Sequence, residues 1–296
     1  MIIREALSQG SADLKFAGIK TPSLDASLLL AHILKMSKTE LITEGNKSIS
    51  EKNCASFCGL IERRCSGECT AYLIGKKEFR GLDFIVNKSV LVPRPDTETL
   101  VETALEKYLT KTDTNLHEPK KSGVLDLCTG SGAIAISLKH ERPDLEVYAA
   151  DISNDALKTA KLNSSRILSK NNQIHFYQGD LFNALSSDSS SLINSFSLII
   201  SNPPYIPSQE IETLSAEVQN EPRIALDGGE DGLDIIKRII NGASEYLING
   251  GALLLEADPR QMQKIVTILE KKGYKDIQLF NDLSDSQRVI GGKREE

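Results

Sequence analysis

From residue 122 onward, short apolar runs alternate with segments of helical periodicity, and this alternation restricts the fold more than any other feature. The expected strands lie near 124–127, 147–150, 174–177, 197–200, 252–255, 275–280 and 287–290, and the expected helices near 133–139, 155–163, 232–248 and 259–271. Unbroken apolar runs suit strands that are buried on both faces. Repeated strand–helix units predict an α/β fold with a doubly wound, mostly parallel sheet.

Two other patterns precede this region. Residues 1–75 have helical periodicity, clearest over 23–34, where Pro22 and Ser23 give a start signal. Over 78–92 the period changes to that of short strands with turns between them, and a new helix is expected from Thr97. The chain of 296 residues is also long for one domain. We therefore expect a small α-helical bundle over 1–75, a linking β-hairpin over 76–93 and the α/β domain over 94–296.

The charge of the chain is unevenly distributed. Residues 1–90 carry 13 Lys and Arg against 10 Asp and Glu, and residues 91–296 carry 22 Lys and Arg against 31 Asp and Glu. The whole chain has a net charge of −6. A protein that grips nucleic acid by its phosphates is usually basic over the contacting face, so stable nucleic-acid binding is not expected. No run approaches the roughly 18 apolar residues of a membrane span, and the first residues do not read as a signal peptide. These features predict a cytoplasmic protein without a membrane partner.

Four of the five cysteines lie close together, at Cys54, Cys58, Cys65 and Cys69. The repeated C-x3-C spacing could in principle gather four thiolates around zinc, but structural zinc sites usually begin from a C-x2-C knuckle flanked by turn residues. Cys54 and Cys58 instead fall in a segment with helical periodicity. We interpret the four as buried free thiols and expect no metal.

The turn after the first strand of the α/β region contains Gly130 and Gly132, which let the backbone bend sharply and approach a ligand closely. The next strand ends at Asp151, 25 residues after Asp126. An acidic residue at this point typically binds both hydroxyls of a ribose. The alternative is that Asp151 only caps the helix that begins near Asp155. The G-x-G turn alone would fit any nucleotide-binding fold.

Two further acidic residues distinguish among nucleotide cofactors. A carboxylate at Asp126, at the end of the first strand, suits a cationic amino group and would repel a pyrophosphate. S-adenosyl-L-methionine carries an amino group and a sulfonium but no phosphate, so we expect it in preference to NAD. At the end of the third strand, Asp180 is expected to accept from the adenine amino group and Leu181 to cover the ring.

The sequence S-N-P-P-Y-I over 201–206 follows the fourth strand directly. A rigid turn is the simplest interpretation, because two prolines fix φ and remove two backbone donors, but a turn requires neither Asn nor Tyr. A planar amide or aryl amine nitrogen is a poor nucleophile because its lone pair is delocalised. The Asn202 side-chain oxygen and the Pro203 carbonyl are expected to accept hydrogen bonds from the two N–H groups of this nitrogen, and Tyr205 is expected to stack on the planar group. The motif predicts methyl transfer to a planar nitrogen.

Short sequence blocks are distributed over nearly the whole chain: 63–64, 67–68, 71–75, 78–79, 81–82, 92–98, the three cofactor segments, 202–205, 221–223, 225–229 and 231–234. In these blocks the chain resembles the bacterial release factor glutamine methyltransferases. The blocks P-R-P-D-T-E at 93–98 and E-P-R…A-L-D-G-G at 221–229 are more specific than N-P-P-Y, which adenine methyltransferases share.

The resemblance implies methylation of the glutamine in the Gly-Gly-Gln motif of peptide chain release factors, with the helical domain helping to grip the release factor. Together with the reasoning above, it implies that the cofactor contacts Asp126, Cys128, Thr129, Gly130, Ser131, Gly132, Asp151, Asp180, Leu181 and Asn202. Catalysis is assigned to Asn202, Pro203 and Tyr205. The substrate is expected to contact Asn202, Pro203, Pro204, Tyr205, Arg94 and Thr97.

The chain departs from the family pattern at Cys128, where glycine is usual, at Cys69, where proline is frequent, and at 257–258, where Ala-Asp replaces Ile-Gly. Cysteine at 128 is compatible with a nearby cofactor provided that its φ is negative. Two alternative functions remain open on the sequence alone: methylation of a glutamine in a ribosomal protein, and adenine-specific methylation of DNA or RNA.

Overall fold

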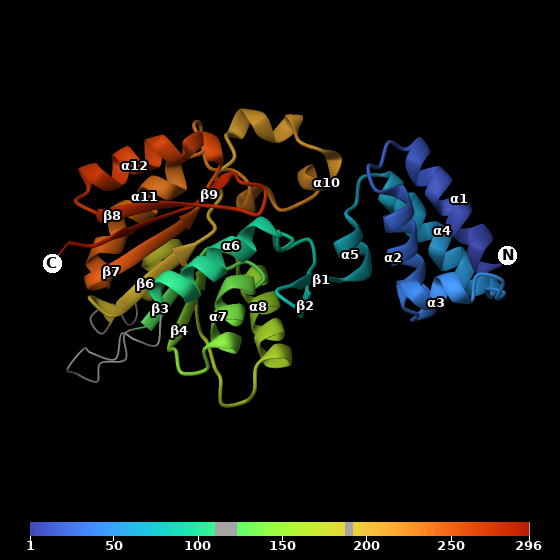
Figure 1. Cartoon of the computed structure of the whole chain (residues 1–296), viewed down its shortest axis with the longest axis horizontal. Helices are drawn as coiled ribbons and strands as arrows, with labels where there is room; N and C mark the ends of the chain where they lie inside the picture. The colour runs from blue at the N-terminus through green and yellow to red at the C-terminus, as the bar shows by residue number, and fades with distance from the viewer. Residues whose placement is uncertain (110–122, 187–191, 296) are drawn as a thin grey trace. The chain divides into compact units, whose positions relative to one another are not determined.

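The structure is a computed structural model, and it describes residues 1–109, 123–186 and 192–295 (Figure 1). The chain divides into two compact units. The first comprises Met1–Lys76 and Leu214–Asn220, and the second comprises Lys77–Thr213 and Glu221–Glu296.

The first unit is a bundle of short helices around an apolar core. The helices are α1 (Ile3–Phe16), α2 (Pro22–Leu34), α3 (Lys38–Thr43), α4 (Glu51–Cys65) and α5 (Thr70–Ile74). The side chains of Leu14, Leu29, Leu30 and Phe57 pack together in the centre of the bundle. Serine residues begin two of these helices, because Ser37 and Ser50 accept hydrogen bonds from the first-turn amides of α3 and α4.

A buried cation ties a distant segment into this bundle. Arg64 is 2% exposed, and its guanidinium pairs with Asp25 at 2.8 Å and with Glu217. Glu217 lies in α10 (Ala216–Gln219), and Asn220 next to it donates to the carbonyl of Gly67 at 3.1 Å. The segment Leu214–Asn220 therefore packs in the first unit, although the residues on either side of it in the chain belong to the second.

A two-stranded hairpin, β1 (Lys76–Phe79) and β2 (Leu82–Ile85), starts at the last residue of the first segment of the bundle unit and otherwise belongs to the second unit. The expected continuation of strand through Val90 and Val92 is wrong, because both residues are buried but lie in irregular backbone. The reason is a contact between residues far apart in the sequence: the Val92 amide donates to the side chain of Glu221 at 3.1 Å instead of to a neighbouring strand.

A seven-stranded sheet forms the centre of this unit, in the order β5-β4-β3-β6-β7-β9-β8. The strands are β3 (Gly123–Leu127), β4 (Val147–Asp151), β5 (His175–Gln178), β6 (Phe196–Ser201), β7 (Leu247–Glu256), β8 (Lys275–Asn281) and β9 (Gln287–Lys293). The first five are parallel, whereas β9 runs antiparallel to both β7 and β8. The predicted doubly wound, mostly parallel Rossmann-like fold with a preceding helical bundle and hairpin is confirmed.

Helices cover both faces of the sheet (Figure 1). The helices of the unit are α6 (Asp96–Thr103), α7 (Ala133–Glu141), α8 (Asn154–Ile167), α11 (Asp234–Tyr246) and α12 (Met262–Lys271), with short helical turns η1 (Ala104–Tyr108), η3 (Leu181–Leu185), η4 (Ser208–Thr213), η5 (Arg223–Ala225) and η6 (Pro259–Gln261). Alternate strand residues face opposite layers: Leu125 and Leu127 pack with α11 and α12, and Val124 packs with α6 and α7. Both faces are covered, so the central strands β3 and β6 are buried along almost their whole length, whereas the edge strands β5 and β8 keep exposed residues.

Candidate active site

A cavity of about 210 Å³ opens at the carboxyl ends of β3, β4, β5 and β6, all within the second unit. Parallel strands bring these ends to one edge of the sheet, which is where doubly wound folds bind ligands. The predicted site residues that line the cavity are Arg94, Thr97, Cys128, Thr129, Gly130, Ser131, Asp151, Asp180, Leu181, Asn202 and Pro204. Asp126, Gly132, Pro203 and Tyr205 are not in its lining.

Asp151 holds the glycine turn against the end of the neighbouring strand. One carboxylate oxygen accepts from the Gly130 amide and the other from the Ser153 amide, each at 2.8 Å. Burial raises the pKa of Asp151, and these amide donors oppose the effect. Ser153 is the N-cap of α8, so the interpretation of Asp151 as a mere helix cap is wrong.

Cys128 has a left-handed backbone, with φ of 59°. The condition of a negative φ at this position is therefore not met, and the reason is the turn itself. The chain must leave β3 and reverse toward Gly130 and Gly132, which also have positive φ values of 56° and 81°. A side chain in this conformation is strained, which explains why glycine suits the position better.

Asp126 lies behind the wall of the cavity. It is 0% exposed, and one of its oxygens accepts from the Thr129 hydroxyl at 2.6 Å and from the Ala135 amide at 3.2 Å. Burial raises the pKa of its carboxyl to about 7. Its direct contacts are thus with the glycine turn and the first turn of α7, and it supports the cavity wall from within.

The third strand end carries Asp180 and Leu181. Asp180 is paired with Arg238 of α11 at 2.6 Å, a contact that the sequence did not indicate. Leu181 is 9% exposed and has a positive φ of 50°, and its side chain forms part of the cavity lining. The end of β5 therefore supplies one charged pair and one apolar surface.

The Asn202–Tyr205 corner begins where β6 ends. The Asn202 side-chain amide donates to the hydroxyl of Thr97 at 3.0 Å. Pro203 is buried and Pro204 faces the cavity. The Tyr205 hydroxyl donates to Glu256 at 3.3 Å, and burial raises the pKa of this phenol. Both polar side chains of the motif thus have a fixed partner.

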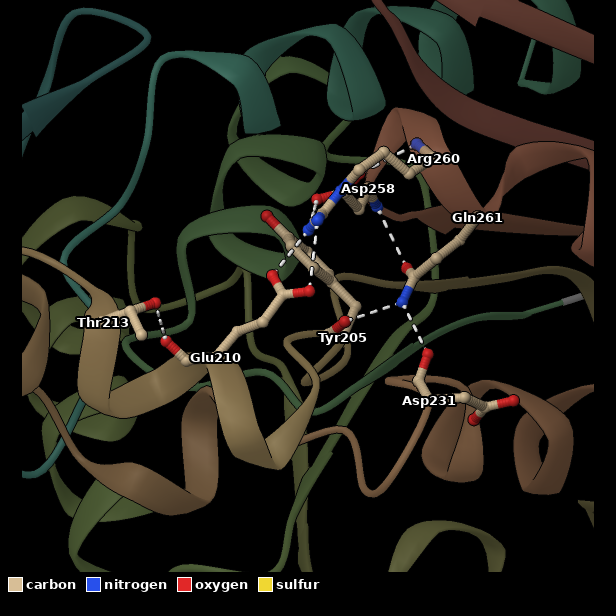
Figure 2. A network of polar contacts seen from close by, with 7 residues as sticks. All are labelled: Tyr205, Glu210, Thr213, Asp231, Asp258, Arg260 and Gln261. Atoms are coloured by element: carbon tan, nitrogen blue, oxygen red, sulfur yellow. Dashed lines mark hydrogen bonds and ion pairs between the residues drawn. The ribbon is translucent and has the colours of Figure 1, made fainter.

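A second set of contacts braces the backbone of this corner (Figure 2). The side-chain amide of Gln261 donates to the carbonyls of Tyr205 at 2.8 Å and of Asp231 at 3.2 Å, and its oxygen accepts from the Asp258 amide at 3.3 Å. Arg260 joins this group to the chain after the motif, since it bonds both Asp258 and Glu210. The backbone at Tyr205 is therefore fixed from the side of η6.

Arg94 lies at the rim of the cavity and pairs with Glu221, whose side chain is almost completely buried. Glu221 also accepts from the Val92 amide. The two blocks 93–98 and 221–229 are thus joined by one carboxylate, and Thr97 from the first block contacts Asn202.

Glu256 and Gln261 are functional candidates that the sequence interpretation missed. Glu256 is the last residue of β7, so the rule that singled out Asp151, an acidic residue at a strand end, would have found it. Gln261 gave no such signal, because a glutamine in a helical turn is ordinary and its partners lie 56 and 30 residues away.

The cysteines of the first unit do not share one environment. Cys69 is buried, Cys54 and Cys65 are half-buried and Cys58 is exposed, so the expectation that all four are buried holds fully only for Cys69 and is wrong for Cys58. Within residues 1–109, 123–186 and 192–295, no group of three or more His, Cys, Asp or Glu side chains is arranged to hold a metal ion. In the same part of the chain, every helix is too short or too polar to cross a membrane.

Comparison with known proteins relates both parts of the chain to one kind of enzyme. The family model "PrmC N-terminal domain" matches residues 5–75, and "Methyltransferase small domain" matches residues 109–218. The release factor glutamine methyltransferase of Coxiella burnetii is 38% identical over 292 residues, 99% of each chain. That of Escherichia coli K12 is 35% identical over 291 residues, 98% of this chain and 97% of its own.

Among solved structures, a methyltransferase from Pyrococcus furiosus has a TM-score of 0.50 at 17% identity, covering 74% of this chain and 92% of that one, and this likeness concerns the fold alone. The curated relatives, which are 35–38% identical over almost the full length, show the family as well as the fold. The chain is a methyltransferase that belongs to the release factor glutamine methyltransferase family.

Proposed function

We propose that the protein methylates the side-chain amide nitrogen of the glutamine in the Gly-Gly-Gln motif of peptide chain release factors. S-adenosyl-L-methionine is the methyl donor and S-adenosyl-L-homocysteine the product. The observation that carries this proposal is the Asn202–Thr97 hydrogen bond of 3.0 Å at the cavity, because it engages the NH2 end of the Asn202 amide. The oxygen end is thereby left for a substrate N–H.

The residues of the cavity suit this cofactor. The carboxylate of Asp151 lies in the lining and keeps further lone pairs for ribose hydroxyls. Leu181 offers an apolar surface for a flat ring. The two arginines of the described lining, Arg94 and Arg238, are already paired with carboxylates, which disfavours a phosphate-bearing ligand. When bound, the cofactor supplies a methyl group attached to a positively charged sulfur.

In the proposed reaction, Asn202 Oδ1 and the Pro203 carbonyl accept hydrogen bonds from the two N–H groups of the substrate amide. Tyr205 packs against the plane of that amide. The bound cofactor would supply the methyl group in line with the nitrogen lone pair, and the sulfur would keep the electron pair of the broken C–S bond. The nitrogen would release its proton to solvent after transfer, so no strong base is needed beforehand. Preset acceptors lower the barrier because they need little reorganisation.

We also propose a separate role for each of three parts of the chain. Residues 1–75 recognise the release factor, 76–93 form the linker, and 94–296 bind the cofactor and carry out the transfer in the cytoplasm. The reaction requires no stable contact with nucleic acid or membrane.

Two other substrates share this chemistry. A ribosomal protein glutamine presents the same amide, and adenine presents a comparable planar amine. The net negative charge of residues 91–296 and the absence of tryptophan from the sequence favour a protein substrate over DNA or RNA.

The direct test is incubation with methyl-labelled cofactor and purified release factor, ribosomal protein or DNA, followed by mass spectrometry of the glutamine peptide. We expect one added methyl group on the Gly-Gly-Gln glutamine. The same peptide should carry this methyl group when it is isolated from cells that contain the gene, and should lack it when it comes from cells without the gene. Label on DNA with none on release factor would refute the proposal.

Two variants assign the roles within the site. Asn202→Ala should lose most methyl transfer while calorimetry still detects cofactor binding. Asp151→Ala should chiefly weaken cofactor binding, by roughly tenfold or more, because a charged acceptor is lost. Undiminished turnover in Asn202→Ala would mean that the acceptor role is wrongly assigned.

A further inference from the structure

Gln261 is a buried side chain with three backbone partners. Its Nε2 atom donates to the carbonyl oxygen of Tyr205 at 2.8 Å and to that of Asp231 at 3.2 Å, and its Oε1 atom accepts from the amide of Asp258 at 3.3 Å (Figure 2). The residue is 6% exposed. One side-chain amide therefore joins the corner after β6, the loop before α11 and the start of η6, all within the second unit.

The chemistry of these partners determines which way the Gln261 amide points. A backbone carbonyl only accepts hydrogen bonds, and a backbone N–H only donates them. The two carbonyls therefore require the NH2 end of the side chain, and the Asp258 amide requires the oxygen end. Both hydrogens of the NH2 group are used, so a glutamate, which has none in its ionised form, cannot reproduce this arrangement.

The loop before α11 leaves just enough room for this side chain. Gly232 has φ of 72°, and a Cβ atom there would lie 2.4 Å from Nε2 of Gln261 and 2.3 Å from the carbonyl oxygen of Tyr205. Any other residue at this point would have to displace one of the two. The close approach of the loop therefore belongs to the same arrangement as the hydrogen bonds.

The N-P-P-Y corner depends on such contacts from outside, because its two prolines have no N–H groups to donate. Just after the corner, the Ile206 amide donates to the Leu226 carbonyl at 3.0 Å. Gln261 holds the carbonyl of Tyr205, one residue earlier. The second proline has a fixed φ, so the chain has one torsion fewer to absorb a shift at Tyr205 before it reaches the Pro203 carbonyl.

We propose that Gln261 is a positioning residue for methyl transfer: by holding the Tyr205 carbonyl it sets the place of the Pro203 carbonyl, one of the two acceptors of the proposed reaction. This inference rests on the proposed function. Gln261 is not among the described residues that line the cavity at the strand ends. It therefore acts on the corner and not on the cofactor, and its loss should lower kcat while the cofactor Kd stays the same.

Two substitutions test this role. Gln261→Glu keeps the size of the side chain but turns an oxygen toward the two carbonyls, and Gln261→Met keeps much of the volume without any N–H. At saturating substrates we expect kcat to fall roughly tenfold or more in both, with the cofactor Kd from calorimetry within about twofold of wild type. Gln263→Glu is the matched control, because it adds the same charge at an exposed position two residues further along α12, and it should keep the wild-type kcat.

The two variants also protect the test against misfolding. If Gln261→Glu does not fold, Gln261→Met carries the measurement, because it brings no charge into the buried site. Wild-type kcat in a folded Gln261 variant would overturn the inference. A cofactor Kd that weakens in parallel with kcat would also overturn it, because the whole site would then be distorted and not the corner alone.

A readout without turnover separates this inference from the proposed function. If wild type fails to methylate release factor, the proposed function fails, and amide hydrogen exchange followed by NMR still tests the positioning role. The Ile206 and Ser208 amides, bonded to the carbonyls of Leu226 and Gly229, should exchange roughly tenfold faster in Gln261→Met than in wild type. The amides of β3 should not change, which would exclude general unfolding. Equal exchange at Ile206 in wild type and Gln261→Met would end the inference.

Discussion

Cys128 has φ of 59°, in the left-handed region where a Cβ atom is strained, and it forms the cavity lining at the same time. Its thiol is half-buried at the cavity wall, and desolvation raises the pKa of the group, so it is a neutral packing side chain. The residue thus combines a backbone conformation suited to glycine with a side chain that fills space beside the cofactor turn.

Cys128→Gly and Cys128→Ala separate these two effects. Both remove the thiol, but only glycine relieves the backbone strain, so Cys128→Gly should be more stable than Cys128→Ala by about 1 kcal/mol. Denaturant unfolding of the two variants measures the difference. Equal stability would mean that the turn relaxes when the side chain is small.

At the scale of elements, the corner after β6 depends on the loop that leads into α11. Gly232 has φ of 72°, and a Cβ there would lie 2.3 Å from the carbonyl oxygen of Tyr205 and 2.4 Å from the Gln261 amide nitrogen. Gly250 has a similar φ of 74° with nothing within 4 Å. The two glycines share a backbone conformation and differ in what surrounds them.

Alanine at these two positions distinguishes backbone strain from displacement of the site. Gly250→Ala should cost about 1 kcal/mol of stability and leave kcat as it is. Gly232→Ala should carry the same strain and also push the backbone of Tyr205, so kcat should fall roughly tenfold or more. The measurements are thermal unfolding and methyl transfer at saturating substrates. Equal kcat in the two variants would contradict the bracing role of this loop.

The same elements show what a sequence can and cannot indicate. The strands around 124–127 and 197–200, the glycine turn and the N-P-P-Y corner are local patterns, and each predicted its own conformation. The partners that fix the side chains are not local: Asp180 meets Arg238 across 58 residues, and Tyr205 meets Glu256 across 51. Such pairs depend on strand order and register, which a single sequence does not specify. The sign of φ at Cys128 was missed for a related reason, because the turn around it, and not the residue type, decides it.

At the scale of the whole molecule, two buried carboxyls make stability depend on pH. The folded state raises the pKa of Asp126 from 3.8 and of Glu256 from 4.5, each to about 7. A raised carboxyl pKa means that the unfolded chain ionises first. The contribution of these two carboxyls to stability is therefore fully present below about pH 4 and is lost as the pH rises from there to about 7.

We expect the free energy of unfolding to fall between about pH 4 and about pH 7 by a few kcal/mol, on the order set by about 1.4 kcal/mol per pKa unit, and to level off above that range. The double variant Asp126→Asn/Glu256→Gln should flatten this decline. Below pH 4 the trend reverses, because Asp227 and Asp282 have lowered pKa values and their contribution is lost on protonation. Urea unfolding at several pH values tests this, and an equally steep decline in the double variant would contradict it.

The buried Arg64 has a consequence for how this chain can be divided. Because Leu214–Asn220 packs with the helical bundle, the polypeptide passes from one unit to the other three times: after Lys76, before Leu214 and after Asn220. A truncation that starts at Lys77 would carry Glu217 and Asn220 away from Arg64 and Gly67, and would leave the Arg64 cation in the discarded piece with Asp25 but without Glu217. A chimera that exchanges these two units between relatives would have to move the seven residues Leu214–Asn220 together with Met1–Lys76.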